Sequence, residues 1–418
     1  MSERTPRWSV ALILGLYLAL GVAYSLVNPI FESPDEALNY ANIRFLVEER
    51  RLPVLEPDKP TKAHHPPLYY VLGALLTHRV PNEDFETVIE RENPFWAFRL
   101  GQPGVDNKSL YLHDPDLESF PYRDVTLGIH LVRWLSLLMG AGTIILVYNT
   151  ARDIFPRRPA LAVGAAALVA FNPMFLFIRA SVHDDALANL VAAATLYVTS
   201  RLLMCGLTTR RAVTLGLLVG LGFLTKLTCL LVVPTVGLAH LYRPLADRSR
   251  AGWREAARLG GIILGLAFLI GGWWFVRNVL LYGEPTSMVR EAEVWGMREN
   301  APDLVAATRE LGFLHDSLWG AFGYGQIPMP RWTYGLARLL SLMAAGGLAL
   351  FWVRRQSGRI PWECPPVVLP VLATAPLVAF LVIFARTTMN AVANFGRYLL
   401  VTSVFLAPLC ILGLSEWL

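Results

Sequence analysis

Long apolar runs, separated by short segments of turn-forming and charged residues, dominate the chain from end to end. A helix needs roughly 20 apolar residues to cross the hydrocarbon core of a bilayer. The pattern predicts about ten membrane-spanning helices, near residues 8–28, 126–150, 158–178, 184–204, 211–224, 227–242, 259–281, 333–353, 365–385 and 396–416. The two runs that flank Lys226 are short for full spans and could form a tight pair. We therefore expect one all-α polytopic membrane domain over residues 1–418.

Composition supports a membrane protein. Of 418 residues, 54% are hydrophobic and 17% are charged, and the mean hydropathy is +0.44. This is too much apolar surface for a soluble core. The first run, residues 8–27, lacks a small-residue cleavage site and resembles a retained span more than a signal peptide. The cysteines are scattered in or beside apolar segments, which argues against a disulfide framework or a CxxC metal site. They are Cys205, Cys229, Cys364 and Cys410.

The charge distribution predicts the orientation of the chain. The net charge is +5 and the pI is about 9.1, but the arginines lie mostly in alternate short loops and at the N-terminus, at Arg4 and Arg7. Short cytoplasmic loops carry such an excess of basic residues, so the basicity reflects topology and does not indicate nucleic-acid binding. We expect a multi-pass protein of the plasma (inner) membrane with a cytoplasmic N-terminus. The loops at 29–125 and 283–332 would then be extracytoplasmic.

The first of these loops, residues 29–125, should be folded, because it mixes charged, proline and aromatic residues without low-complexity character. Apolar spacing predicts one helix over Asp35–Arg50 and a more hydrophobic helix over Pro66–Leu76. Both are expected to lie along the membrane surface.

Two adjacent carboxylates, Asp35 and Glu36, follow the first span. In one interpretation they belong to a capping box, with Ser33 as N-cap, Pro34 at the first helical position and Glu36 at the third. In another, Asp35 is a general base that takes the proton from an acceptor hydroxyl while its oxygen attacks a sugar carbon. Glu36 could then orient the acceptor, hold a cation or only complete the cap. The two interpretations are compatible.

Histidines and further acids are predicted to face the same compartment. His64 and His65 precede Pro-Pro at the entry of an apolar helix, where a histidine is commonly an interfacial anchor. Together with the acids of this loop they could hold a divalent metal, although no spacing rule makes such a site specific. Asp184 and Asp185 follow His183 at the start of a span, where negative charge is favourable in any case. A functional role for this second group therefore remains open. Asn172-Pro173, just before it, is expected to kink the third span.

Several cations lie near the predicted outer ends of spans. Snorkelling towards the interface is the ordinary interpretation of Lys226 and of Arg277 and Asn278, which follow a tryptophan pair. Arg397 lies inside the start of the last span and needs an anionic partner, either a carboxylate or a phosphate. At about 4 Å and an effective dielectric near 20, one cation–phosphate contact has a Coulomb energy of roughly 4 kcal/mol. Two or three such residues could stabilise a phosphate leaving group.

Short motifs occur in a fixed order along nearly the whole chain. They are Pro34-Asp35-Glu36, His65-Pro66-Pro67-Leu68-Tyr69-Tyr70, Asn172-Pro173-Met174-Phe175, Asp184-Asp185-Ala186-Leu187-Ala188, Leu224-Thr225-Lys226, Trp273-Trp274-Phe275-Val276-Arg277-Asn278 and Gly396-Arg397-Tyr398-Leu399. In this order they resemble the GT-C superfamily of polyprenyl-phosphate-sugar-dependent membrane glycosyltransferases. The similarity is to the branch that contains the protein O-mannosyltransferases, the lipid A aminoarabinose transferase and a bacterial family of poorly characterised membrane proteins.

The resemblance implies a GT-C-like fold and inverting transfer of a hexose or pentose from a polyprenyl-phosphate donor on the outer face of the membrane. The acceptor would be a lipid, a polysaccharide or a protein. By position the catalytic acid is Asp35 or, second, Glu36, and Lys226, Arg277 and Arg397 would contact the phosphate. The full set of candidate substrate-binding residues is His64, His65, Tyr69, Asp184, Asp185, Lys226, Arg277, Asn278 and Arg397. Related sequences often have a histidine where this chain has Asn39, which argues against a metal or acid role there.

Two other classes of protein remain as alternatives. A transporter or flippase of lipid-linked sugars should have polar residues at mid-membrane and an inverted repeat, and the sequence shows neither clearly. A scaffolding membrane protein would leave the one-sided cluster of polar residues unexplained. No cofactor is required by the predicted transfer, although a divalent metal could bind.

Overall fold

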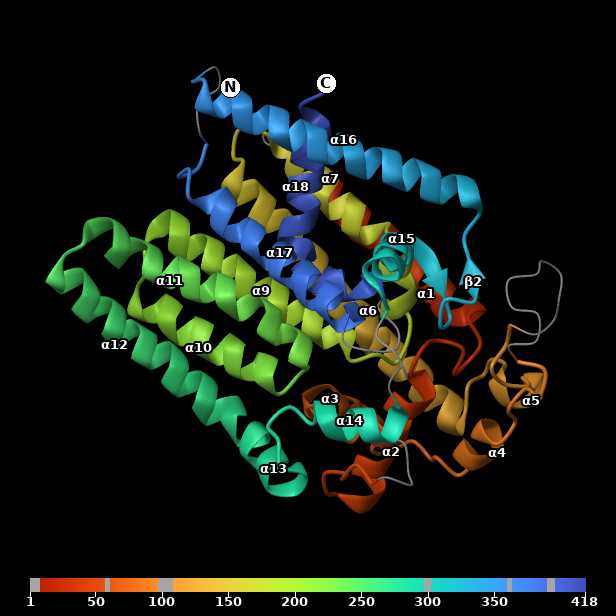
Figure 1. Ribbon diagram of the computed structural model, residues 1–418. Coiled ribbons are helices and arrows are strands. Elements are labelled where there is room, and N and C mark those ends of the chain that lie inside the picture. The colour runs from red at the N-terminus through yellow and green to blue at the C-terminus, as the bar shows by residue number, and fades with distance from the viewer. Residues whose placement is uncertain (1–7, 57–60, 97–107, 297–301, 359–362, 389–394) are drawn as a thin grey trace.

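The computed structural model describes residues 8–56, 61–96, 108–296, 302–358, 363–388 and 395–418; Arg4 and Arg7 lie outside these ranges. The described part of the chain is almost entirely helical (Figure 1). Its elements are α1 (Trp8–Val27), α2 (Glu36–Glu49), α3 (Leu68–Thr77), α4 (Phe85–Ile89), α5 (Pro115–Glu118), α6 (Asp124–Ile154), α7 (Pro159–Ala170), α8 (Pro173–Arg179), α9 (Asp185–Cys205), α10 (Thr209–Phe223), η1 (Leu227–Val232), α11 (Val233–Asp247), α12 (Arg250–Ala267), η2 (Phe268–Gly272), α13 (Trp273–Tyr282), α14 (Met288–Trp295), α15 (Leu304–Gly320), β1 (Ala321–Phe322), β2 (Ile327–Pro328), α16 (Arg331–Gln356), α17 (Val368–Thr388), η3 (Gly396–Thr402) and α18 (Ser403–Ser415).

The membrane-spanning helices are fewer than the ten expected. Within the described residues, eight helices are long and apolar enough to cross a bilayer, or nine if the bent pair α7–α8 counts as one span. All ten predicted runs are helical, but α10 has only 15 residues. At 1.5 Å per residue it is about 22 Å long, short of a hydrocarbon core of about 30 Å. The all-helical polytopic fold is confirmed.

The predicted kink in the third span is also confirmed. The axes of α7 and α8 differ by 58°, and the break lies at Asn172-Pro173. The Asn172 side chain caps α8 by accepting a hydrogen bond from the Phe175 N–H at 2.9 Å. Because Pro173 cannot donate to the preceding turn, the helix restarts there in a new direction. The far end of α8 then leads directly to His183 and the two acids that follow.

The helices of the first long loop gather at one end of the bundle (Figure 1), where α2 packs against α3. Their bounds confirm the two helices expected in this loop to within two residues. The predicted capping box is wrong. Helix α2 begins at Glu36, its N-cap is Asp35, and no side chain caps it. The Ser33 hydroxyl instead accepts a hydrogen bond from the Asn28 side chain at 2.8 Å.

The second large loop contains a small hairpin, residues 321–328. Strands β1 and β2 are antiparallel, with Phe322 opposite Ile327. The Tyr334 hydroxyl on α16 fixes the base of the hairpin, because it donates to the Gly320 carbonyl at 2.5 Å and accepts from the Met329 N–H at 2.8 Å. The hairpin therefore has a fixed place relative to the start of α16, and it contacts α8 through Phe322 and Phe177.

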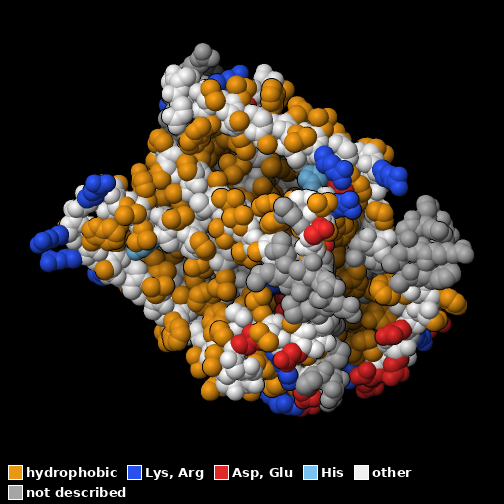
Figure 2. Space-filling model, viewed as in Figure 1, with side chains coloured by type: hydrophobic (Ala, Val, Ile, Leu, Met, Phe, Trp, Pro, Cys, Tyr) orange, Lys and Arg blue, Asp and Glu red, His pale blue; other side chains and the backbone are white. Residues whose placement is uncertain are grey.

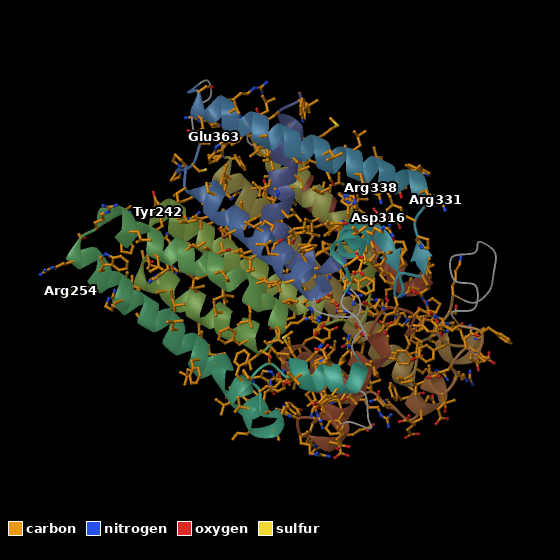
Figure 3. The ribbon with its side chains drawn as sticks, viewed as in Figure 1. Tyr242, Arg254, Asp316, Arg331, Arg338 and Glu363 are labelled. Atoms are coloured by element: carbon orange, nitrogen blue, oxygen red, sulfur yellow. The ribbon has the colours of Figure 1, made fainter. Side chains whose placement is uncertain are left out.

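The surface separates charged ends from an apolar middle. In Figure 2, hydrophobic side chains cover the central part of the visible face, while lysine and arginine gather at the α11–α12 end and carboxylates near α2 and α5. Figure 3 shows Arg254 extending from that α11–α12 end, and Arg338 beside Asp316 between α16 and α15. The arrangement fits a bundle whose middle contacts lipid. No membrane is present in the structure, so the inside–outside orientation and the interfacial position of α2 and α3 stay predictions.

Candidate functional site

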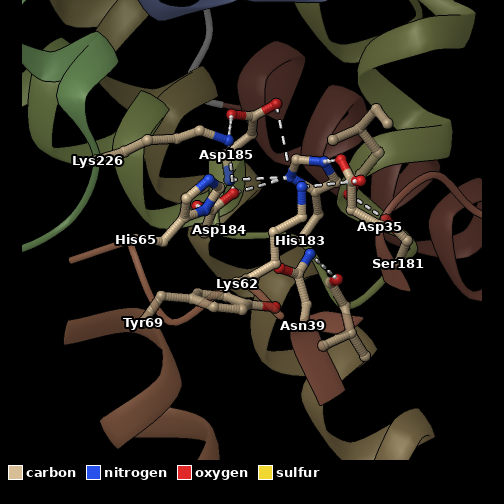
Figure 4. A network of polar contacts seen from close by, with 12 residues as sticks. Asp35, Asn39, Lys62, His65, Tyr69, Ser181, His183, Asp184, Asp185 and Lys226 are labelled. Carbon is tan, nitrogen blue, oxygen red and sulfur yellow. Dashed lines mark hydrogen bonds and ion pairs between the residues drawn. The ribbon is translucent and has the colours of Figure 1, made fainter. Parts of the chain in front are cut away.

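One cluster of ionisable side chains joins segments that are far apart in the sequence (Figure 4). It is built at helix ends: Asp35 precedes α2, Asp184 precedes α9, Lys226 precedes η1 and Arg397 is the second residue of η3. The loop before α3 adds Lys62 and His65. Six of the candidate residues predicted from the sequence thus meet here: Asp35, His65, Asp184, Asp185, Lys226 and Arg397.

Asp35 is surrounded by three basic side chains. Its Oδ1 lies 3.1 Å from the Lys62 Nζ, and its Oδ2 lies 3.4 Å from an Arg397 guanidinium nitrogen and 3.8 Å from the His183 Nε2. Burial opposes ionisation of this carboxyl, but the charges of Lys62, Arg397 and His183 outweigh burial and hold its pKa well below the usual range. Asp35 is therefore a carboxylate at neutral pH.

The backbone of Asp35 is also unusual. Its φ of 61° places it in the left-handed region, which residues with a Cβ seldom adopt. The Asp35 N–H donates to the hydroxyl of Tyr324, on the hairpin, at 2.9 Å. Such conformations persist where surrounding contacts hold them, and they are frequent at functional sites.

Asp184 and Asp185 form the deepest part of the cluster. The Lys226 Nζ lies 2.6 Å from the Asp184 Oδ1 and 2.7 Å from the Asp185 Oδ1. The other Asp184 oxygen lies 2.8 Å from the His65 Nδ1. Burial, partly opposed by the charge of Asp184, lowers the pKa of His65 to about 4. A neutral His65 then donates from Nδ1 to Asp184. Lys226 does not snorkel to the surface; its side chain is 11% exposed and its ammonium is paired with both acids.

His183, Asp184 and Asp185 could hold a metal ion by spacing alone, since one donor atom from each lies within 4.8 Å of the others. The Lys226 ammonium, however, already binds both carboxylates at hydrogen-bond distance. In addition, the Asp185 N–H donates to the His183 Nδ1 at 3.2 Å. A metal would compete with Lys226 for the same carboxylate oxygens. The group therefore fits a metal only if Lys226 moves away.

Three buried polar atoms at the edge of the cluster have no hydrogen-bond partner among the described residues. They are the His183 Nε2, the Asp185 Oδ2 and the Arg397 Nε. The Asp185 and Arg397 atoms lie 4.0 Å apart, and the His183 atom lies 3.8 Å from the Asp35 carboxylate. Buried polar groups without partners are rare in native proteins and costly. Their concentration beside Asp35 marks a place where a polar ligand can bind.

Glu36 faces away from Asp35 and into the protein. Arg133 donates to its Oε1 at 2.8 Å and to its Oε2 at 2.7 Å. The N–H groups of Val182 and Phe31 donate to the same two oxygens. Arg133 also donates to three backbone carbonyls, those of Ser25, Asn28 and Pro29. Both charged side chains are fully buried, so the pair ties the segment after α1 to α6 and to the loop before α9.

Other candidates lie outside this group of contacts. Arg277 donates to the Pro53 carbonyl at 2.6 Å and Asn278 donates to the Pro285 carbonyl at 3.0 Å, and the described contacts join neither to Asp35. The Tyr69 hydroxyl bonds to Ser136 within the protein interior.

His64 stacks edge-on against His65, and its Nε2 lies 3.7 Å from a carboxylate oxygen of Glu291. Burial opposes the charge of Glu291, but the contact with His64 outweighs burial and lowers the pKa of Glu291 to about 2. This pair brings α14 over the loop that carries His64 and His65. Asn39 donates to the Val182 carbonyl and accepts from the Tyr70 hydroxyl, which is a structural role for that position.

Sequence reasoning missed three residues at the site: Lys62, Arg133 and Tyr324. Lys62 lies two residues before the histidine pair, so its proximity to a recognised motif could have drawn attention to it. Arg133 lies inside the second span, where an arginine demands a buried partner. Tyr324 carries no recognisable signal in the sequence.

Comparisons with known proteins agree with this architecture. Residues 128–275 match a family model described as dolichyl-phosphate-mannose-protein mannosyltransferase. A comparison with curated protein sequences gives no significant match. The crystal structure of ArnT from Cupriavidus metallidurans bound to undecaprenyl phosphate is similar over 99% of this chain, with a TM-score of 0.57 and 14% identity. That of the Archaeoglobus fulgidus oligosaccharyltransferase in complex with Zn and sulfate is similar over 96% of this chain, with a TM-score of 0.53 and 16% identity.

The chain spans 61% of the length of that ArnT chain and 48% of that of the oligosaccharyltransferase. At such low identity the likeness in structure establishes the fold, while the family match rests on the part of the chain that begins within α6 and ends within α13. The chain therefore has the fold of the GT-C membrane glycosyltransferases, and over residues 128–275 it has the sequence pattern of the dolichyl-phosphate-mannose-protein mannosyltransferase family.

Proposed function

We propose that the protein is an inverting glycosyltransferase that moves a sugar from a polyprenyl-phosphate donor to an acceptor hydroxyl, with Asp35 as general base. The observation that carries the proposal is the group of unpartnered buried atoms on His183, Asp185 and Arg397 beside the ionised Asp35. A ligand with an anionic group and hydroxyls would satisfy them. The family match, and a structural neighbour that binds undecaprenyl phosphate, support this donor class.

The reaction follows from the charges at the site. The acceptor oxygen forms a bond to the anomeric carbon while the bond from that carbon to the phosphate oxygen breaks. The phosphate leaves with the electron pair, and the acceptor proton passes to the Asp35 carboxylate. The departing polyprenyl phosphate gains negative charge, which Lys62 and Arg397 are placed to stabilise. One carboxylate in this role is sufficient for inversion at the sugar carbon.

Glu36 has a structural role in this proposal. Its two oxygens accept four hydrogen bonds from Arg133, Val182 and Phe31. A carboxylate occupied in this way has no oxygen left for an acceptor proton. Arg277 and Asn278, which contact Pro53 and Pro285, are not assigned a donor contact.

The transporter interpretation is weaker because the ionisable cluster lies at helix ends and not midway along the spans. A transport site would also leave the ionised Asp35, with its unusual backbone, without a specific task. The sugar, the acceptor and the side of the membrane are separate questions that a transfer assay with varied substrates can address.

The test is sugar transfer by purified protein in lipid nanodiscs from a panel of labelled polyprenyl-phosphate sugars, with wild type beside Asp35→Asn. General-base catalysis contributes about 10²- to 10⁴-fold, so we expect turnover to fall by at least about 100-fold while donor binding is retained. Asp316→Asn is a matched control, because Asp316 also pairs with an arginine, Arg338, on α16. Near-normal turnover in Asp35→Asn would reject Asp35 as base. Binding of a donor without transfer to any acceptor would favour the transporter, and an absence of binding to every donor would reject the proposed donor class.

A further inference from the structure

The hairpin of residues 321–328 contacts two different features of the molecule. At its tip, the Tyr324 hydroxyl accepts the hydrogen bond from the Asp35 N–H at 2.9 Å. Along its side, Phe322 packs edge-on against Phe177 of α8, with 5.1 Å between the ring centroids. Gly323 and Gly325 have positive φ angles of 59° and 97°, which permit the sharp reversal at the tip. The hairpin thus joins the bundle wall to the backbone of the candidate base.

An apolar groove of about 410 Å³ runs between the hairpin and the end of α1. Its apolar lining comes from Leu20, Tyr24, Val27, Phe177, Phe322 and Ile327. Figure 1 shows β2 beside α1 at this place. Val27 is 81% exposed and Leu20 is 42% exposed. These side chains therefore present an uncovered apolar surface on a membrane-spanning helix.

The groove and Asp35 share the same two chain segments. Asn28, Pro29 and Glu32 line the groove, and the segment that they begin ends at Asp35. The opposite wall is the hairpin, whose Tyr324 holds Asp35. A molecule with a phosphate at Arg397 and a long apolar chain could therefore reach the groove from the site along either segment. A polyprenyl phosphate is such a molecule, because it carries an anionic phosphate at one end of a long apolar chain.

We propose that the polyprenyl chain of the donor occupies this groove and that the hairpin, through the Tyr324 hydroxyl, couples its occupancy to the placement of Asp35. The inference rests on the proposed function, since the polyprenyl phosphate is the donor of that reaction. Tyr324 is then a positioning residue: it holds the left-handed backbone of Asp35 and touches neither the sugar nor the phosphate. Part of the binding energy of the polyprenyl chain is used to orient Asp35. Contact between this chain and the groove therefore raises kcat as well as the affinity for the donor.

The kinetic test compares wild type with Tyr324→Phe, each with two donors that have the same sugar but long or short polyprenyl chains. In the wild type, we expect the short donor to lower kcat as well as to raise KM. In Tyr324→Phe, loss of one hydrogen bond should lower kcat for the long donor by about 3- to 10-fold. The kcat values for the two donors should then be nearly equal, because the coupling has been removed.

Tyr282→Phe is the matched control, since the Tyr282 hydroxyl accepts a backbone hydrogen bond of the same length, 2.9 Å, from Leu55. It should keep the wild-type dependence of kcat on chain length. A wild-type kcat that is independent of chain length, or a Tyr324→Phe variant that keeps the full dependence, would overturn the coupling.

A measurement without turnover separates this inference from the proposed function. Hydrogen exchange in nanodiscs is followed with undecaprenyl phosphate or with farnesyl phosphate as the probe. In the wild type, the long probe should protect the amides of residues 28–36 and of the hairpin more than the short probe does. In Tyr324→Phe, the hairpin and residues 28–32, which line the groove, should remain protected, while residues 33–36 lose the effect.

If undecaprenyl phosphate protects neither segment in the wild type, the inference is wrong even where sugar transfer occurs. If the coupled protection is seen but no donor supports transfer, the inference holds and the proposed reaction fails. Equal protection of residues 33–36, which lie beyond the lining of the groove, in wild type and Tyr324→Phe would show that Tyr324 does not transmit the effect.

Discussion

The Glu36–Arg133 pair provides a direct test of which adjacent acid takes part in chemistry. Glu36→Gln removes a buried charge but preserves the size of the side chain. At the 2.7 Å between the Glu36 Oε2 and the Arg133 nitrogen, an effective dielectric near 20 gives a Coulomb energy of about 6 kcal/mol. Losing one partner of a buried pair typically costs about 3–5 kcal/mol in the free energy of unfolding. Three backbone carbonyls still accept from Arg133, so we expect the lower value, about 3 kcal/mol.

The assay is thermal unfolding in nanodiscs, combined with turnover per folded molecule. Glu48→Gln is the control, because Glu48 pairs with Arg44 at 2.7 Å on the same helix, with the carboxylate 46% exposed. Such an exposed pair should contribute less than about 1 kcal/mol. The Glu36→Gln variant should unfold at a lower temperature, and its folded fraction should turn over at a near-normal rate. Adding Arg133→Met should lower the stability further, because the carbonyls of Ser25, Asn28 and Pro29 then lose their hydrogen-bond donor. Unchanged stability with turnover abolished would refute this reasoning and make Glu36 catalytic.

Three further predictions concern the charges around the site and the first loop. Arg397→Ala should weaken donor binding by about 10- to 100-fold, and Arg397→Lys by less; equal affinity in titrations of all three proteins would remove Arg397 from the site. Chelators should not lower wild-type turnover, whereas Lys226→Ala should lower the unfolding temperature and newly bind Zn²⁺, as measured by metal analysis; metal bound by the wild type with Lys226 intact would contradict this. Burial opposes the charge of His113, but hydrogen bonds to Glu118 and Glu32 outweigh it and raise the pKa of His113 from 6.5 to about 9. The folded state therefore binds this proton more tightly. The resulting stabilisation is complete below about pH 6.5 and is lost as the pH rises through 9, so the unfolding temperature should fall over that interval and His113→Gln should remove the slope.

The sequence was sufficient for the spans, because crossing a bilayer needs a length of apolar residues that can be counted directly. The sequence shows that the α10 segment is apolar, but a helix of only 15 residues is short for a span. Whether it crosses the bilayer depends on how the neighbouring helices pack around it, which the sequence does not show. The kink at Asn172-Pro173 could also be predicted from the sequence, because proline lacks the N–H that would continue the hydrogen bonding of its own helix. Rules that use only neighbouring residues were therefore sufficient where neighbouring residues determine the structure.

The prediction of a capping box was wrong because of a contact between residues that are far apart in the sequence. The Glu36 carboxylate binds Arg133, 97 residues further along the chain. This buried charge pair takes precedence over a cap that would be worth about 1 kcal/mol. Lys226 was misread in the same way, because its partners Asp184 and Asp185 lie 42 and 41 residues earlier. Each motif was visible by itself, and only the packing of α9 against η1 shows that they neutralise each other.

Contact lengths divide the cations of the site into two groups with different tasks. Lys226 lies 2.6 and 2.7 Å from its two acids, the distance of strong charge-assisted hydrogen bonds. Lys62 and Arg397 lie 3.1 and 3.4 Å from Asp35, and Asp35 is also more exposed, at 21% against at most 7% for the two acids. Weaker and more accessible contacts can be exchanged for phosphate oxygens at less cost in free energy. On the proposed function, Lys226 therefore maintains the shape of the site throughout the reaction. Lys62 and Arg397 turn to the phosphate when the donor binds, and this leaves the Asp35 carboxylate free to accept the proton of the acceptor.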